Sequence, residues 1–187
     1  MCTCCIPDVF KTEASQSICN DMAGTEDKIS LLKRIAHRLN EAQVKWCLGA
    51  SMMLYFKGIV SEFHDIDLMI SVEDVEVVKT ILSEMGTLCP SDQEPNPMYQ
   101  TKCFMEYVID EIDVDVMAGF AIVREGKIYD CTLCKDQITD QLMLDDEVIP
   151  MQSPRLWYRY YRLMGRSAKA NMIEKAMEMT GADHIGT

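Results

Sequence analysis

The chain lacks long apolar runs and is poor in basic residues. No apolar stretch among its 187 residues approaches the roughly 20 residues that a membrane-spanning helix needs. Lys and Arg number 18 against 30 Asp and Glu, which gives a formal net charge of −12. Because nucleic-acid affinity comes largely from Lys and Arg contacts with phosphates, this balance argues against general nucleic-acid binding. It still allows a bound nucleotide, since a divalent cation reverses the local charge, and it suits a cationic small substrate.

A recognisable targeting segment is also missing from the start of the chain. The first residues, MCTCCIPDVFKTEASQ, lack the basic start and long apolar middle of a signal peptide. We therefore expect a soluble, cytoplasmic protein. The length fits one domain of ordinary size, and no internal repeat is visible. We expect a flexible, Cys-rich segment over 1–24, a folded domain over 25–150 and a helical segment over 151–187.

Nine cysteines occur in the chain, and this odd number without an export signal favours free thiols over disulfides. Cys131 and Cys134 form a CxxC pair, and four more cysteines lie near the start, at positions 2, 4, 5 and 19. Neither group has the paired spacing of a zinc ribbon or a Cys/His finger. We interpret these thiols as small apolar side chains, and the alternative is a zinc or redox protein.

The spacing of apolar residues predicts helices and strands in irregular order. Three- and four-residue apolar steps, together with capping and stop signals, predict helices over 26–42, 51–56, 71–86, 154–164 and 168–179. Strands are expected over 44–48, within 59–71, and over 101–109, 112–120, 121–123 and 127–133. The order predicts an α+β fold with a mixed sheet flanked by helices and with helices at the C-terminal end. A regular βαβ alternation is not indicated.

Acidic residues stand one residue apart at two of these strands. Asp65 and Asp67 flank Ile66 at the start of a buried strand, and Asp113 and Asp115 alternate with apolar residues in 112–117. Side chains two positions apart in a strand share a face, so each pair would repel without a cation nearby. Three carboxylates that converge from two neighbouring strands form a hard oxygen site for Mg²⁺. The alternative interpretation of these residues is an exposed acidic face.

A short turn between strand and helix precedes the first acidic pair. It contains Gly49 and Ser51, within the sequence WCLGASMM. A glycine lets the backbone approach an anion closely, and amides at a helix start favour phosphate. Near the C-terminal end, Arg166 and Lys169 lie one helical turn apart and could together contact a triphosphate. A solvated basic face is the alternative for that pair.

The order Gly-Ala-Ser, then His-Asp-Ile-Asp at a strand start, then an acidic strand resembles the nucleotidyltransferase superfamily of polymerase-beta-like fold. It is most similar to the small minimal members and to the aminoglycoside and lincosamide nucleotidyltransferases. The resemblance covers 44–120 well and 149–173 more loosely. It implies that the domain over 25–150 is a nucleotidyltransferase-like domain. The chain departs from the usual Gly-Gly or Gly-Ser pair, because Ala50 follows Gly49 and the serine comes one position later.

The resemblance implies the roles of the acidic residues. Asp65, Asp67 and Asp115 would be catalytic and would bind two Mg²⁺ ions, with Asp113 as the reserve choice for the third carboxylate. Asp115 is preferred because Val114 and Val116 flank it. Gly49, Ser51, Arg166 and Lys169 would bind the phosphates of the nucleotide.

The implied activity is metal-dependent transfer of a nucleoside monophosphate from an NTP, expected to be ATP, to a hydroxyl of a small acceptor. An antibiotic is one candidate acceptor. The alternative is a non-catalytic nucleotide- or partner-binding module of the same fold, as in a toxin–antitoxin pair. A homodimer, in which a second copy supplies another wall of the site, is also considered.

Overall fold

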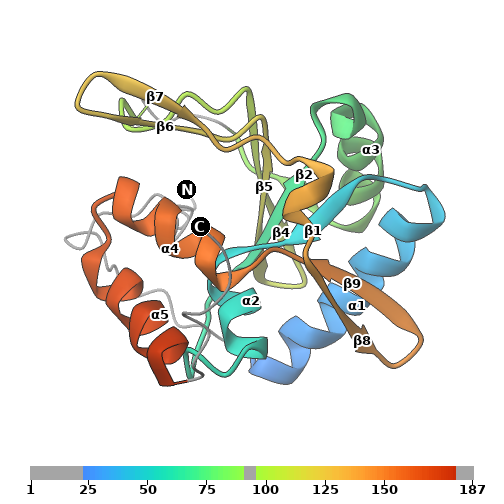
Figure 1. The fold of residues 1–187 in the computed structure, drawn as a ribbon. Helices are drawn as coiled ribbons and strands as arrows, with labels where there is room; N and C mark the ends of the chain where they lie inside the picture. The colour runs from blue at the N-terminus through green and yellow to red at the C-terminus, as the bar shows by residue number, and fades with distance from the viewer. Residues whose placement is uncertain (1–22, 91–95, 180–187) are drawn as a thin grey trace.

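The computed structural model describes residues 23–90 and 96–179 (Figure 1). Most of the expected Cys-rich segment, residues 1–22, lies outside the described residues. Among the described residues, no helix combines the length and the apolar character that crossing a membrane requires. In chain order the elements are α1 (Thr25–Glu41), β1 (Trp46–Leu48), α2 (Ala50–Phe56), β2 (Ile66–Ile70), η1 (Val72–Asp74), α3 (Val75–Met85), β3 (Thr87–Leu88), β4 (Cys103–Ile109), β5 (Ile112–Ala118), β6 (Ala121–Arg124), β7 (Lys127–Asp130), η2 (Lys135–Gln137), β8 (Asp140–Leu144), β9 (Glu147–Met151), α4 (Pro154–Leu163) and α5 (Ser167–Met179).

Seven of the strands form one mixed sheet, in the order β3-β4-β5-β2-β1-β9-β8, while β6 pairs with β7 in a separate hairpin. β2 runs parallel to β5, and β1 runs parallel to β9. The other neighbouring strands of the large sheet are antiparallel. This arrangement confirms the predicted α+β fold with a mixed sheet.

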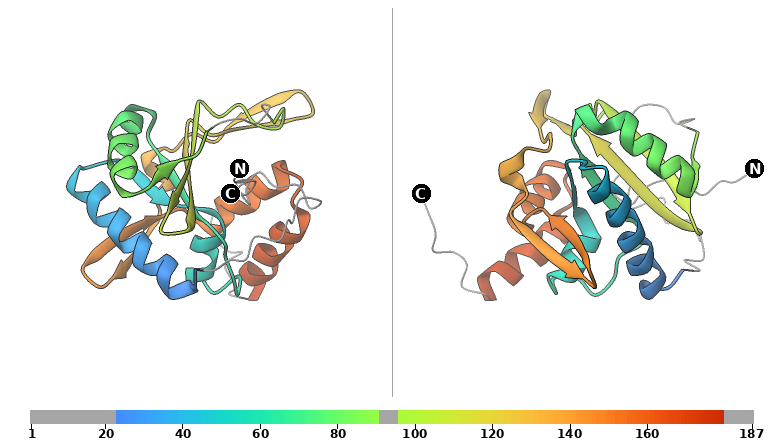
Figure 2. Two further views of the ribbon diagram at one scale, coloured as in Figure 1. Left: turned by 180° about the vertical axis from the view of Figure 1, so that it is seen from behind. Right: turned by 90° about the vertical axis from the view of Figure 1, so that its right-hand side faces the viewer.

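Helices cover both faces of the large sheet. α1 and α3 pack on one face, and α2, α4 and α5 lie on the other (Figures 1 and 2). Ile66 and Leu68 in β2 are fully buried, as is Val114 in β5. The period-2 alternation of a strand places Asp67 and Asp115 on the face opposite to these apolar residues. Ser51 of α2 donates a hydrogen bond to Asp65, two residues before Asp67, so the acidic side chains lie on the side of the sheet that carries α2.

The β6–β7 hairpin projects from the sheet toward the end of α4 (Figure 1). Near the hairpin turn, Arg124 Nη1 donates hydrogen bonds to the carbonyl oxygens of Arg162 at 2.7 Å and Leu163 at 3.0 Å. The last carbonyls of a helix have no partner within the helix, so Arg124 caps the C-terminal end of α4. The hairpin is thereby connected to the C-terminal helices.

Three strands, β3, β8 and β9, are absent from the sequence prediction. β9 runs across the predicted boundary between residues 150 and 151, and Leu48 of β1 pairs in parallel with Met151 of β9. The helix predicted from Pro154 is α4, and Ser153 Oγ before it accepts a hydrogen bond from the backbone of Leu156. The last strand of the sheet thus leads directly into α4.

Candidate active site

The turn between β1 and α2 is fixed by contacts on both sides. The backbone amide of Gly49 donates to the carbonyl oxygen of Asp67 at 3.0 Å, which connects the turn to β2. Gly49 is extended, with φ −120°, so its backbone conformation does not require glycine. A Cβ atom there would lie 2.5 Å from Cζ2 of Trp157 in α4. Glycine is therefore needed at this position for the space that the Trp157 ring fills.

The two residues after Gly49 are restricted as well, Ala50 by its backbone conformation and Ser51 by a hydrogen bond of its side chain. Ala50 has φ +41°, in the left-handed region that favours glycine. Ser51 is buried, and its hydroxyl donates to Oδ1 of Asp65 at 3.3 Å. The Ser51 side chain is thus engaged with the acidic group, and only its backbone amide remains as a phosphate donor. The predicted phosphate contacts of Gly49 and Ser51 stay predictions.

Three carboxylates meet beside this turn. Asp67 in β2 and Asp115 in β5 are paired in register in the parallel ladder, and Asp65 lies one residue before β2. One ligand atom from each of the three residues lies within 4.8 Å of the others. All three residues are buried, with exposed fractions of 3% for Asp65, 0% for Asp67 and 2% for Asp115. Asp113, the reserve choice, is half-buried and does not belong to this group.

The electrostatics of this group are unfavourable without a cation. Burial, followed by the charges of four acidic neighbours, raises the pKa of Asp115 well above its usual value; the neighbours are Asp65, Asp67, Glu106 and Asp113. Asp115 Oδ2 is buried and has no hydrogen-bond partner among the described residues. A buried carboxylate oxygen left in this way is costly, and a bound cation would compensate for it. The three residues therefore fit a divalent cation, for which carboxylate oxygens are the preferred ligands.

Arg166 and Lys169, the predicted phosphate ligands, lie at the start of the last helix. Arg166 comes one residue before α5, so the expectation that both stand on one helix is wrong for Arg166. Burial raises the pKa of Tyr99, and the nearby Arg166 charge partly opposes that rise. Lys169 Nζ is 5.7 Å from the centre of the Tyr161 ring. Both cations thus lie near aromatic rings, and their contact with a triphosphate stays a prediction.

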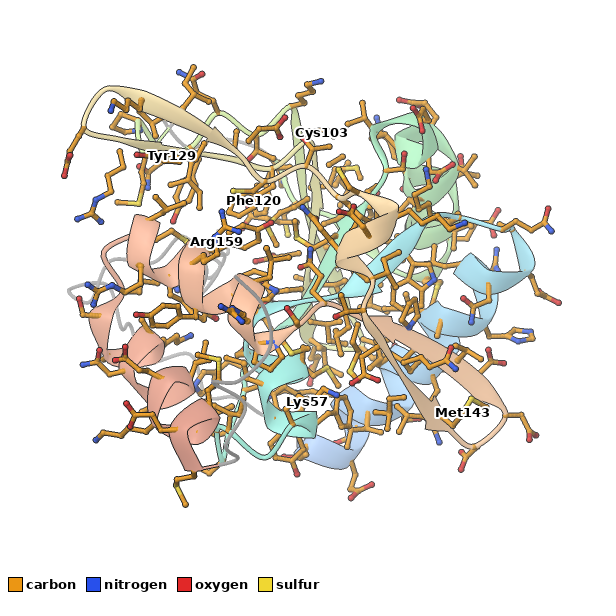
Figure 3. All side chains as sticks on the ribbon, viewed as in Figure 1. Lys57, Cys103, Phe120, Tyr129, Met143 and Arg159 are labelled. Atoms are coloured by element: carbon orange, nitrogen blue, oxygen red, sulfur yellow. The ribbon has the colours of Figure 1, made fainter. Side chains whose placement is uncertain are left out.

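Trp157 and Gln152 connect the C-terminal helices to the turn. Trp157 is fully buried and donates from Nε1 to Gln152 Oε1 at 2.9 Å. The backbone amide of Gln152 donates to the carbonyl of Leu48 at 3.2 Å, at the end of β1. Tyr160 packs edge-on against both Trp157 and Phe120, and Phe120 lies between α4 and the strands (Figure 3). Neither Trp157 nor Gln152 is among the site residues that the sequence predicts.

A match to a protein-family model identifies the enzyme class of the chain. The model of the aminoglycoside-2''-adenylyltransferase family matches residues 31–177, which include the turn, the three carboxylates and the C-terminal helices. The chain belongs to this family. As a member of the aminoglycoside-2''-adenylyltransferase family it is a nucleotidyltransferase, which confirms the predicted enzyme class and disfavours the non-catalytic module. No curated protein sequence matches the chain significantly.

Solved structures agree with the fold of the family. The chain is similar to TM1012 of Thermotoga maritima, named as a nucleotidyltransferase, at 23% identity and a TM-score of 0.65, over 84% of this chain and 96% of that one. ANT(2'')-Ia in complex with adenylyl-2''-tobramycin is similar at 11% identity and a TM-score of 0.54, over 80% and 88%. The lincosamide adenylyltransferase LnuA, bound to lincomycin, is similar at 14% identity and a TM-score of 0.53, over 78% and 95%. At these identities the likeness shows the shared fold.

The cysteines of this family member give no support to the zinc alternative within the described residues. Four cysteines there are free thiols: 47, 103, 131 and 134. The thiols of Cys131 and Cys134 each donate to a nearby backbone carbonyl, at 3.5 Å and 3.4 Å. Within 23–90 and 96–179, Asp65, Asp67 and Asp115 are the group of acidic, His or Cys side chains that could hold a metal ion. The cysteines at positions 2, 4, 5 and 19 lie outside this part of the chain.

Proposed function

We propose that this protein transfers AMP from ATP to a hydroxyl group of a small acceptor and releases pyrophosphate, with an aminoglycoside as the first candidate acceptor. The acceptor oxygen forms a bond to the α-phosphorus of ATP, and the bond from that phosphorus to pyrophosphate breaks. The hydroxyl proton passes to a base. The observation that carries this proposal is the group of three buried carboxylates at the Gly49 turn, in a chain of an adenylyltransferase family.

The three carboxylates have distinct roles in this proposal. Asp65 and Asp67 would hold two Mg²⁺ ions, and Asp115 would hold one of them. Bound Mg²⁺ supplies positive charge that neutralises the phosphates of the nucleotide. Asp115 Oδ2, which has no hydrogen-bond partner among the described residues, would accept the proton of the acceptor hydroxyl.

The phosphates would lie along the Gly49 turn. The backbone amides of Ala50 and Ser51 belong to the segment that joins β1 to α2, directly beside Asp65 and Asp67. The Gly49 amide already donates to the carbonyl oxygen of Asp67, so Gly49 would contribute to the phosphate site through the shape of the turn. Backbone amides at such a turn are suitable donors to phosphate oxygens. Arg166 and Lys169 would bind the triphosphate tail. Positioning and charge neutralisation would then provide most of the rate enhancement.

The test compares Asp67→Asn with Asp113→Asn in a pyrophosphate-release assay that contains ATP, Mg²⁺ and tobramycin. Asp67 belongs to the buried group and Asp113 lies two residues from Asp115 outside it, so the two variants are matched in charge and chemistry. We expect Asp67→Asn to lower kcat by about 100-fold or more, the range found when a major electrostatic contact is lost. Asp113→Asn should stay within about tenfold of the wild type, because its effect on Asp115 is a longer-range charge effect.

Circular dichroism spectra and melting curves of both variants control for folding. Unchanged transfer by Asp67→Asn would eliminate the proposed metal site. A larger loss in Asp113→Asn than in Asp67→Asn would instead identify Asp113 as the third carboxylate. The full set of nucleotides should be compared in the same assay, and a preference for another NTP would correct the ATP assignment.

A further inference from the structure

The β6–β7 hairpin turns one face toward α4. Ile122 and Arg124 stand two positions apart in β6, so their side chains share a face. Tyr99, which precedes β4, pairs with Ile122 in an antiparallel bridge and therefore belongs to the same face. The ring of Tyr99 stacks on Phe120 with 6.2 Å between the ring centres, and Phe120 in turn contacts Tyr160 of α4 edge-on. Tyr99 and Arg124 thus lie on the face that meets α4.

α4 ends in a Schellman motif, which fixes the path of the chain beyond the helix. Gly165 has φ +75°, and its amide donates to the carbonyl oxygen of Arg162 at 3.2 Å. The amide of Arg166 donates to the carbonyl oxygen of Tyr161 at 2.8 Å. These are the two hydrogen bonds of the motif, and a left-handed glycine is its usual residue at this position. The motif therefore sets the position of the Arg166 backbone relative to α4.

Arg124 adds two contacts to this helix end. Its Nη1 donates to the carbonyl oxygens of Arg162 at 2.7 Å and Leu163 at 3.0 Å. The carbonyl of Arg162 thereby accepts a second hydrogen bond, and the carbonyl of Leu163 takes part in neither bond of the motif. A cation at the C-terminal end of a helix also interacts favourably with the helix dipole. Arg124 therefore holds the last turn of α4 against the hairpin.

The same helix end leads to Arg166. Arg166 is the third residue after Leu163, with which α4 ends. Burial raises the pKa of Tyr99 and the charge of Arg166 partly opposes that rise, so the guanidinium of Arg166 lies close to Tyr99. The hairpin thus reaches Arg166 in two ways: Arg124 caps the turn from which its backbone continues, and Tyr99 lies near its side chain.

We propose that Arg124 is a positioning residue for Arg166, through which the hairpin contributes to binding of the β- and γ-phosphates of ATP. This inference rests on the proposed function, in which Arg166 binds the triphosphate tail. Arg124 acts through the backbone of α4, because its Nη1 donates to helix carbonyls. The strength of an arginine–phosphate contact depends on the orientation of the guanidinium, so a displaced turn weakens ATP binding without removing a phosphate ligand.

The test measures the affinity of the full chain for a non-hydrolysable ATP analogue in the presence of Mg²⁺. AMP, which lacks the β- and γ-phosphates, is measured by competition with that analogue. The variants are Arg124→Gln, Arg124→Lys and, as the matched control, Lys127→Gln. Lys127 is exposed, carries the same charge and is paired in register with Arg124 on the neighbouring strand.

Loss of a charge-assisted hydrogen bond costs roughly 10- to 100-fold in affinity, and a displaced arginine keeps part of its contact, so we expect Arg124→Gln to weaken binding of the ATP analogue about three- to tenfold. Arg124→Lys should restore part of this loss, because an ammonium still donates to helix carbonyls. AMP affinity should stay close to the wild-type value in all variants, and Lys127→Gln should change neither affinity.

Equal affinity of wild type and Arg124→Gln for the ATP analogue would overturn the inference. So would an equal loss of AMP affinity, which would show a general structural effect, or an equal loss in Lys127→Gln, which would show an effect of charge alone. Wild-type binding of the ATP analogue no tighter than that of AMP would also refute it. Melting temperatures of all variants are measured, and affinities are compared at a temperature at which every variant is folded.

A double-mutant cycle with Arg166→Gln tests the route through Arg166. Arg124→Gln should weaken binding of the ATP analogue less in the Arg166→Gln background than in the wild type, because the side chain that Arg124 positions is already missing. Independent losses, or no loss in Arg166→Gln alone, would refute an action through Arg166.

These outcomes separate the inference from the proposed function. ATP-analogue binding that depends on Arg124 and Arg166, without pyrophosphate release from ATP in the presence of Mg²⁺ and tobramycin, would support the inference and contradict adenylyl transfer to that acceptor. Pyrophosphate release together with an ATP-analogue affinity that Arg124→Gln leaves unchanged would support the function and refute the role of Arg124.

Discussion

Replacement of Gly49 by alanine tests whether the Trp157 ring, and hence α4, determines the shape of the nucleotide turn. The added Cβ would lie 2.5 Å from Cζ2 and 3.0 Å from Cε2 of Trp157. The ring has little room to move, because Tyr160 and Tyr161 pack against it with ring centres 5.5 Å and 5.4 Å away. Overpacking of this kind costs about 1–3 kcal/mol of stability. Alanine also lowers the conformational entropy of the unfolded chain, which offsets at most about 1 kcal/mol of that cost. We expect Gly49→Ala to be destabilised by about 1–2 kcal/mol, or roughly 2–8 °C in melting temperature.

A double-mutant cycle with Trp157→Phe isolates this contact. Phenylalanine lacks the atoms that the new Cβ would meet, and it also removes the hydrogen bond to Gln152. The single Trp157→Phe change should cost about 1–3 kcal/mol, because it leaves a buried amide oxygen without that donor. In the double variant the alanine should add little, which gives a coupling energy of about 1 kcal/mol or more. Urea unfolding followed by far-ultraviolet circular dichroism measures all four proteins, and strictly additive costs would show that the Gly49→Ala Cβ and the Trp157 ring do not clash.

Two further predictions concern the same site. The raised pKa of Asp115 means that, in chelator-treated protein, the folded state keeps a proton that the unfolded state releases above pH 3.8. The free energy of unfolding should therefore fall as pH rises through and beyond that value, by at most about 1.4 kcal/mol per pH unit. Asp115→Asn should lack this fall and melt higher than the wild type at neutral pH, and equal pH profiles of the melting temperature would contradict the assignment. Ala50→Gly should stabilise the protein by about 0.5–1 kcal/mol in urea unfolding, because it relieves the left-handed φ of +41°, and destabilisation would show that this backbone conformation is not strained.

The parts of the fold that local patterns specify were predictable. The helix expected over 26–42 is α1, Thr25–Glu41, because its apolar residues recur at helical spacing and are buried. β2, Ile66–Ile70, is buried throughout and is apolar apart from Asp67, so the sequence predicts a strand directly after Asp65. Of the two candidates for the third carboxylate, Asp115 and not Asp113 lies with Asp65 and Asp67, while the catalytic role of Asp115 stays a prediction.

The parts that depend on distant pairing were not predictable. β8 and most of β9 are exposed or half-buried, so they lack a clear apolar alternation, and Pro150 inside β9 argues against a strand. Glu106 is placed opposite Asp115 by the two-residue turn between β4 and β5. The two residues of that turn, Asp110 and Glu111, both have positive φ. Such turns usually contain Asn-Gly or Asp-Gly, and this turn contains neither, so the sequence does not reveal the register of the hairpin. The need for glycine at 49 arises from a tryptophan more than 100 positions later, which no local pattern reveals.

The pairing of β1 with β9 has a consequence for synthesis of the protein. β1, Trp46–Leu48, is buried along its whole length, but its neighbour on one side is made only when the chain reaches Met151. At about 5–20 residues per second, the nascent chain would leave that apolar edge uncovered for roughly 5–20 seconds. An unpaired strand edge can pair with other chains. During this interval, chaperone binding or aggregation of the nascent chain therefore competes with completion of the sheet.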